Sequence, residues 1–158
     1  MIYGFTTGLK PSQLHLLESL PRRRNPPDVL FGPTLAALLV ELARDTGREV
    51  GVLVDRRGAV RQVVVGTSEN LPLPAPDLPE GGLRPGLRLL HAHPGLRPLS
   101  PEDCTCLFSH RLDAIAGKIN PASGLFWDCQ EKGRGHDRGW WVGLSPEAHY
   151  AYTQGHAC

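Results

Sequence analysis

The sequence predicts an α/β domain: a small mixed β-sheet of three to four strands with flanking helices, and a poorly ordered C-terminal tail. Leucines recur at helical spacing between Gly32 and Gly47, and apolar runs of strand length occupy residues 49–55, 60–65 and 87–90. Apolar periodicity is lost after about Gly117. We therefore expect one domain over residues 1–117 and a divergent, partly disordered tail over residues 118–158.

The composition fits a globular chain without a bulk charge. Of the 158 residues, 41% are hydrophobic and 21% are charged, and the net charge is +1. Local basic clusters must therefore carry any binding to nucleic acid. No leader sequence or membrane-length apolar run is evident, and the four cysteines have no disulfide or zinc-knuckle spacing, so we expect a cytoplasmic, reduced protein that contacts no membrane.

The first half of the chain predicts two helices. Leu14, Leu17 and Leu20 give a short helix an apolar face that ends before Pro21, and a basic turn, Arg22 to Arg24, follows. Pro33 suits the first turn of a second helix, whose buried face is formed by Leu35, Leu38, Leu39 and Leu42. Gly47 is a typical residue to end it.

A β-hairpin follows the second helix. Residues 49–55 are apolar enough for a strand that is covered on both faces, and residues 60–65 return after a short turn. Residues 71–86 hold many prolines and glycines, which exclude a regular element. We interpret that segment as a long loop.

Residues 87–90 predict a third strand that delivers His91 and His93 to the same side of the sheet. Ser100 is a good N-cap and Asp103 would be the third helical residue, which predicts a third helix. We expect its buried face to contain Leu107, Phe108, Leu112 and Ile115. Further on, residues 125–127 could form a short strand, and His136, His149 and the pair Trp140-Trp141 lie in an unpatterned segment.

Several stretches in this order resemble the N-terminal domain of the HflX family of ribosome-associated GTPases. The resemblance covers roughly residues 8–116. It is carried by the stretches Gly8 to Leu14, Arg22 to Asp28, Val50 to Gly58, Val63 to Gly66, Leu87 to His93, Pro98 to Asp103 and Arg111 to Ala114. It implies a small α/β domain that binds the large ribosomal subunit.

The resemblance also implies which parts of the family's chemistry this chain contributes. Family members hydrolyse GTP with magnesium in a later domain, and Gly-x-x-x-x-Gly-Lys-Ser/Thr is absent from these 158 residues. We therefore expect a truncated or frameshifted form, a monomer that is not an enzyme by itself and needs no cofactor. The residues expected to contact rRNA phosphates are Arg22, Arg23, Arg24, Arg56 and Arg57.

A second resemblance is to the JAMM metalloproteases and the related RadC proteins, which carry Glu, then His-x-His-Pro, then Ser-x-x-Asp. Carried over, it implies zinc ligands at His91, His93 and Asp103, a general base at Glu49 and an oxyanion donor at Ser100. Six residues separate His93 from Ser100, one fewer than in that pattern.

We therefore interpret the histidine cluster as a degenerate site with a structural role and no metal. A JAMM-like zinc-dependent isopeptidase remains the enzymatic alternative. A remnant that folds but has no function is the third.

Overall fold

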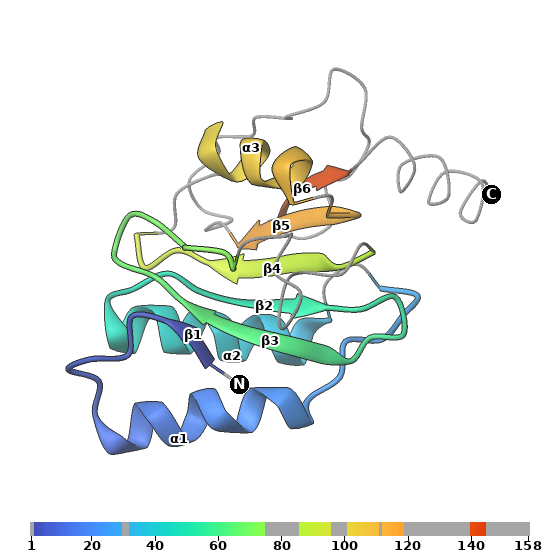
Figure 1. Cartoon of the computed structure of the whole chain (residues 1–158). Coiled ribbons are helices and arrows are strands. Elements are labelled where there is room, and N and C mark those ends of the chain that lie inside the picture. The colour runs from blue at the N-terminus through green and yellow to red at the C-terminus, as the bar shows by residue number, and fades with distance from the viewer. Residues whose placement is uncertain are drawn as a thin grey trace.

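The computed structural model describes residues 2–29, 32–74, 86–95, 101–110, 112–118 and 140–144. One six-stranded mixed sheet has helices on both faces (Figure 1), in the strand order β1-β3-β2-β4-β5-β6. The strands are β1 (Ile2–Gly4), β2 (Val50–Val54), β3 (Val60–Val65), β4 (Arg88–Ala92), β5 (Ala114–Lys118) and β6 (Trp140–Leu144). The α/β class predicted from the sequence is confirmed.

Two helices cover one face of the sheet, α1 (Pro11–Ser19) and α2 (Pro33–Thr46), with a 3₁₀ turn (Leu20–Arg22) after α1. The leucine spacing predicted both helices, and Gly47 ends α2 in the left-handed conformation at φ 65°. The third helix, α3 (Pro101–Ser109), lies on the opposite face above β5 and β6.

The predicted hairpin forms, and it is extended on both sides. β2 pairs antiparallel with β3 and with β4, and β1 pairs parallel with β3. β5 pairs parallel with β4, and β6 pairs antiparallel with β5. This pairing places β2 and β4 at the centre of the sheet, where every one of their residues is buried.

Each face of the sheet has its own apolar core, as the near-continuous apolar strands predicted. One core joins α1 and α2 to the sheet through leucines such as Leu17, Leu35 and Leu39. The other lies on the α3 side and contains Leu53, Val64, Leu71, Leu87, Leu89, Leu112 and Ile115. His91 alternates with Leu90 along β4 and therefore faces the second side.

The expected number of strands was wrong, because three further strands were not recognised. β1 is only three residues long, and both Tyr3 within it and Phe5 just after it are exposed, so no apolar pattern marked it. Leu112 and Ile115 are buried as predicted, but α3 ends at Ser109 and Ile115 lies in β5. A short apolar run fits a helix face or a strand equally well, and pairing with β4 decides it.

The predicted boundary at residue 117 falls within β5, and β6 of the predicted tail pairs with β5 in the same sheet. The rest of that tail lies outside the described residues, as do the expected short strand at residues 125–127, His136 and His149. In the described ranges, no helix has the length and apolarity needed to cross a membrane.

Candidate functional site

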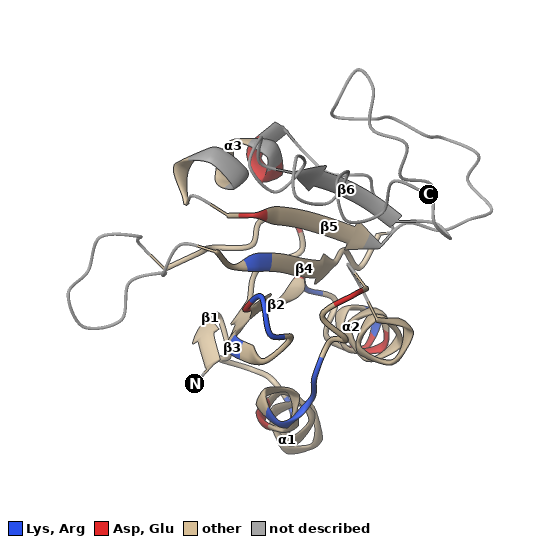
Figure 2. Cartoon of the chain, turned by 90° about the vertical axis from the view of Figure 1, so that its right-hand side faces the viewer, with Lys and Arg blue, Asp and Glu red and all other residues tan. Residues whose placement is uncertain are grey.

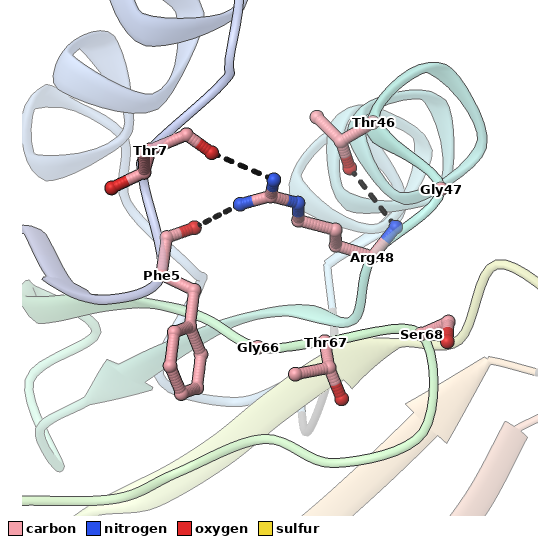
Figure 3. A pocket seen from close by; sticks show the side chains of 8 residues that line it. All are labelled: Phe5, Thr7, Thr46, Gly47, Arg48, Gly66, Thr67 and Ser68. Carbon is pink, nitrogen blue, oxygen red and sulfur yellow. Dashed lines mark hydrogen bonds between the residues drawn. The ribbon is translucent and has the colours of Figure 1, made fainter.

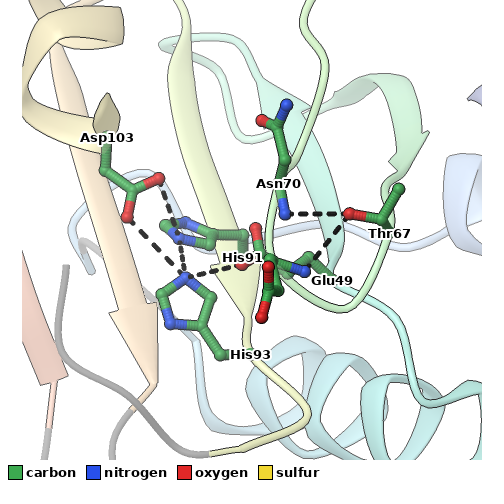
Figure 4. A network of polar contacts seen from close by, with 7 residues as sticks. Glu49, Thr67, Asn70, His91, His93 and Asp103 are labelled. Atoms are coloured by element: carbon green, nitrogen blue, oxygen red, sulfur yellow. Dashed lines mark hydrogen bonds and ion pairs between the residues drawn. The ribbon is translucent and has the colours of Figure 1, made fainter. Parts of the chain in front are cut away.

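Four polar side chains meet at the carboxyl end of β4. Two of them are His91 and His93, which are 0% and 4% exposed and point to the same face of the sheet, as the His-x-His spacing predicted. Their Nε2 atoms lie 2.8 Å apart (Figure 4). The predicted convergence of the two imidazoles is therefore present.

Glu49 reaches the same place through the register of the sheet. Val50 pairs with Ala92 and Gly51 with His91, so the residue before β2 lies across from His93. The backbone of Glu49 is fixed by Thr67 and Gly66, since its N–H donates to the Thr67 carbonyl and its carbonyl accepts from the Gly66 N–H. Its carboxylate Oε1 lies 3.7 Å from Nε2 of His93, and the side chain is buried.

Asp103 approaches from the other side, out of the first turn of α3. Its two carboxylate oxygens lie 3.6 Å from Nε2 of His91 and 3.7 Å from Nε2 of His93. The loop after His93 is one residue shorter than in the JAMM pattern, yet it leaves Asp103 facing both imidazoles. Ser100, the implied oxyanion donor, lies outside the described residues.

Small residues surround His91 in the sheet. Its neighbour in β2 is Gly51 and its neighbour in β5 is Gly117, so neither adjacent strand puts a side chain beside the imidazole. A Cβ at Gly51 would lie 2.8 Å from Leu71 Cδ2 and 3.0 Å from His91 Cβ, which is too close. The absence of a side chain at Gly51 thus lets Leu71 and His91 pack over the same point.

Together, one ligand atom each from His91, His93 and Asp103 lie within 4.8 Å of one another, and all three residues are buried. Two imidazole nitrogens and a carboxylate oxygen are a donor set typical of zinc in proteins. Glu49 adds a second carboxylate beside this group. The arrangement has the chemistry to hold a divalent cation.

The predicted arginines form a second candidate site at the opposite end of β4. Arg24 makes an isolated antiparallel bridge with Ala59, and the Asn25 N–H donates to the carbonyl of Gly58. The basic turn after α1 therefore lies against the β2–β3 turn, which carries Arg56 and Arg57 (Figure 2). We call this surface, Arg22 to Arg24 with Arg56 and Arg57, the basic edge.

Asn25 and Gly58 hold the two halves of the basic edge together. The fully buried Asn25 side chain donates to the carbonyls of Pro26 and Val29 and accepts from the N–H of Gly32. Gly58 has a φ of 82°, and a Cβ there would lie only 1.8 Å from the carbonyl oxygen of Asn25. The close approach of the two turns therefore requires glycine at this position.

All five arginines of the basic edge are exposed, and one of them has an acidic partner. Arg56 makes a two-pronged ion pair with Asp113, at 2.6 and 3.0 Å. The Asp113 side chain holds the pKa of Arg56 above its ordinary value. The other four arginines make no ion pair within the described part of the chain, so their charges face solvent.

Arg88 lies beneath the basic edge at the start of β4. It is 8% exposed, and its guanidinium donates to the carbonyls of Val29 and Asp55 at 3.2 and 3.3 Å. Burial lowers the pKa of Arg88, while Asp113 and Asp55 act in the opposite direction. Arg88 thus ties the segment before α2 to the β2–β3 turn.

A pocket of about 380 Å³ opens beside Arg48 and Thr67 (Figure 3). Arg48 precedes Glu49 in the sequence, and the Thr67 carbonyl accepts the Glu49 N–H. Its cation is already used, because the Arg48 guanidinium donates to the backbone carbonyls of Phe5 and Thr7. The side chains of the histidine cluster do not line it. We interpret the pocket as a consequence of fixing the N-terminal segment.

Cys106 is a half-buried free thiol one turn beyond Asp103. Burial raises its pKa, and the nearby carboxylates of Asp103 and Glu102 raise it further. A thiol with a raised pKa is a poor nucleophile and a poor metal ligand at neutral pH. The surroundings of Cys106 are therefore those of an ordinary helix position.

No protein-family model, curated protein or solved structure matches this chain.

Sequence reasoning missed the residues that support the sites: Asn25, Gly58, Arg88 and Asp113. Asn25 and Gly58 had a local signal, since an Asn-Pro-Pro segment and an Arg-Arg-Gly turn both require special backbone geometry. Arg88 and Asp113 had none, because their partners are distant in sequence.

Proposed function

We propose that this chain is an HflX-like N-terminal domain that binds the large ribosomal subunit through rRNA phosphates and performs no GTPase chemistry itself. The proposal places it in the cytoplasm, where ribosomes work. Two observations support the proposal. One is the resemblance to the HflX family over residues 8–116, and the other is the position of the basic edge.

The observation that carries the proposal is the Arg24–Ala59 bridge. It joins two arginine-bearing turns that are more than 30 residues apart in sequence into one exposed surface. A nearly neutral chain has no general attraction for nucleic acid, so a local cluster is needed. Guanidinium groups suit phosphate oxygens because their donors match two oxygens at once.

The test is co-sedimentation with purified large ribosomal subunits at increasing salt, with the wild type and Arg22→Gln/Arg23→Gln/Arg24→Gln. We expect wild-type binding to fall steeply with salt. Each phosphate contact contributes about 0.7–0.9 to the slope of log affinity against log salt, so the triple variant should lose roughly 2 from that slope.

A matched control removes two positive charges from exposed positions outside the basic edge. Arg22→Gln/Arg23→Gln is compared with Lys10→Gln/Arg44→Gln, since Lys10 and Arg44 are exposed near the opposite ends of α1 and α2. Only the first pair should weaken binding. Absence of binding at low salt, or equal loss in both pairs, would contradict the proposal.

A second candidate function is zinc-dependent hydrolysis of an isopeptide bond, in the manner of the JAMM proteases. One observation favours it: the Glu49 carboxylate lies 3.7 Å from His93, on the side of the cluster away from Asp103. A carboxylate beside a metal-bound water is placed to accept its proton.

The test of this second function uses quenched isopeptide substrates with the zinc-loaded wild type and Glu49→Gln. Cleavage that is lost in Glu49→Gln while zinc content stays unchanged would support hydrolysis. No cleavage by a fully zinc-loaded wild type would dismiss it for these substrates and leave ribosome binding unaffected.

A further inference from the structure

The first strand of the sheet carries two aromatic side chains that solvent reaches. Tyr3, within β1, is 40% exposed, and Phe5, just after β1, is 53% exposed. Tyr3 pairs with Val64, whose side chain belongs to the apolar core on the α3 side, so Tyr3 faces that side of the sheet. Isolated exposed hydrophobic residues are ordinary, whereas neighbouring ones are typical of interaction surfaces.

The backbone that carries these rings is held firmly although the rings themselves are exposed. The Phe5 N–H donates to the Val65 carbonyl, and the Arg48 guanidinium donates to the carbonyls of Phe5 and Thr7 (Figure 3). Gly4 has a φ of 103°, and a Cβ there would overlap the Val65 carbonyl oxygen, so the close contact of β1 with β3 requires glycine. A ligand that binds the rings therefore meets a preorganised surface, which lowers the entropy cost of binding.

The charges around the two rings suit a polyanion. Residues 2–9 and 60–67, which include β1 and β3, contain no aspartate or glutamate. Their one charged residue is Arg61, which is paired with Asp55. Arg48 lies beside Phe5 and makes no ion pair with any residue that the structure describes, so its positive charge is not neutralised. A phosphate backbone would meet attraction here and no repulsion from these two strands.

β3 connects the aromatic rings to the basic edge. At the start of this strand Ala59 forms the bridge with Arg24, and further along Val64 pairs with Tyr3. Five residues of extended chain between Ala59 and Val64 correspond to roughly 16 Å. Small domains that bind single-stranded nucleic acid contact about 4–16 nucleotides, so one strand of RNA is long enough to reach both places.

Two kinds of partner fit an exposed edge strand with aromatic side chains. Among the described strands β1 pairs with β3 alone, so a second copy of the chain could pair with its free edge. However, β1 has three residues, and very short edge strands resist such pairing. Aromatic side chains on a sheet are a common platform for unpaired RNA bases, and the nearby cations favour that partner.

We propose that Tyr3 and Phe5 stack on unpaired bases of rRNA whose phosphates lie on the basic edge. This inference rests on the proposed function and specifies the kind of RNA, a single-stranded segment. The pocket beside Phe5 adds the hydroxyl-bearing residues Thr7, Thr67 and Ser68, which suit hydrogen bonds to a base or a ribose 2′-OH. Stacking alone does not select a base, because every base has an aromatic face.

The experiment compares two labelled probes of the same length and charge by fluorescence anisotropy. One is single-stranded RNA of about eight nucleotides, and the other is its abasic counterpart, which keeps the sugar-phosphate backbone and lacks the bases. The whole chain should bind the RNA at least about 5-fold more tightly than the abasic probe. Phe5→Leu and Tyr3→Leu should each weaken RNA binding by at least about 5-fold and leave binding to the abasic probe unchanged.

Control variants separate stacking from general effects. Phe5→Tyr keeps an aromatic ring and should bind RNA as the wild type does. Leu16→Ala, which changes a 38% exposed side chain of α1, should also leave binding unchanged. Arg22→Gln/Arg23→Gln/Arg24→Gln should weaken binding to both probes equally, because it removes phosphate contacts. Circular dichroism of each variant establishes that it folds.

Three results would overturn the stacking proposal. The first is a wild type that binds the RNA no more tightly than the abasic probe, or binds neither at low salt. The second is RNA affinity that is unchanged in both folded leucine variants. The third is a dimer of the wild type that Phe5→Leu dissociates while RNA affinity stays the same, which would make β1 a self-pairing edge. Failure of the proposed function shows separately, as a wild type that does not co-sediment with large subunits.

Discussion

The two ends of β4 carry opposite kinds of polar site. At its amino end, Arg88 is buried below a surface of five exposed arginines that come from two turns. At its carboxyl end, His91 and His93 meet two carboxylates, and all four side chains are buried. One central strand of five residues thus separates an open cationic surface from a closed cluster of metal-binding groups.

Exposure decides what each of the two sites is able to bind. Exposed arginine side chains are hydrated and conformationally free before they bind. Each one therefore contributes little binding free energy by itself, and strong binding requires contacts with many phosphates at once. Buried imidazoles and carboxylates have already lost their hydrating water on folding. A small cation can therefore interact with all of them at once without a further cost of removing that water. A polymer suits the first site and a single cation suits the second.

The largest expected effect comes from breaking the basic edge at its backbone contact. Gly58→Ala should lower the free energy of unfolding by about 3 kcal/mol or more, since it combines an unfavourable positive φ with a clash against the Asn25 carbonyl. Urea denaturation monitored by circular dichroism measures the change.

Gly47→Ala is the matched control. Gly47 also has a positive φ of 65°, but a Cβ there meets nothing within 4 Å, so we expect a loss of about 1 kcal/mol. Equal losses in the two variants would mean that the Asn25 segment does not pack on the β2–β3 turn.

A change of salt concentration should separate the two ends of β4 in one protein. If four exposed arginines contact phosphates, affinity for the large subunit should fall about 100-fold between about 50 and 200 mM salt. Zinc affinity should change by less than about 3-fold, because buried groups are weakly screened. Sedimentation and zinc titration in the same buffers measure the two affinities. If both affinities fell equally with salt, the two ends of β4 would not differ in the way proposed.

The smallest expected effect concerns Asp55, which shapes the turn that carries Arg56 and Arg57. Burial raises the pKa of Asp55, but hydrogen bonds from the Ala59 N–H, the Arg61 side chain and the Arg57 N–H outweigh burial and lower it below the ordinary value of 3.8. Because the folded pKa is the lower one, the charged form stabilises the fold above that ordinary value. The contribution is lost as the pH falls through the folded pKa.

Asp55→Asn should therefore cost about 1 kcal/mol near neutral pH, and its difference from the wild type should vanish in strong acid. Denaturation at several pH values measures it, with Glu41→Gln on the exposed side of α2 as the control for loss of one negative charge. A difference that is constant across the acid range would show that the Asp55 charge does not hold the turn.

The predicted fold was correct where a local pattern had one meaning. The leucine spacing of α2, its glycine stop and the apolar hairpin strands all form as expected. Ile115 was predicted to be buried, and it is, but in β5 instead of a helix. Local apolarity determines burial, whereas pairing with β4 determines the element.

Local sequence is enough to predict which kinds of side chain each site contains. Period-two alternation sends His91 and His93 to one face whatever surrounds them, and clustered arginines beside prolines remain at the surface because burying them is too costly. The types of residue that meet at each site therefore follow from local sequence.

Which of these residues meet depends on contacts between distant segments. Strand register places Glu49 opposite His93, the packing of α3 turns Asp103 toward both histidines in spite of the short loop, and the Arg24–Ala59 bridge joins the two basic turns. Each of these depends on pairing between distant segments. Such pairing is decided by the packing of the whole core, so no local stretch of sequence specifies it.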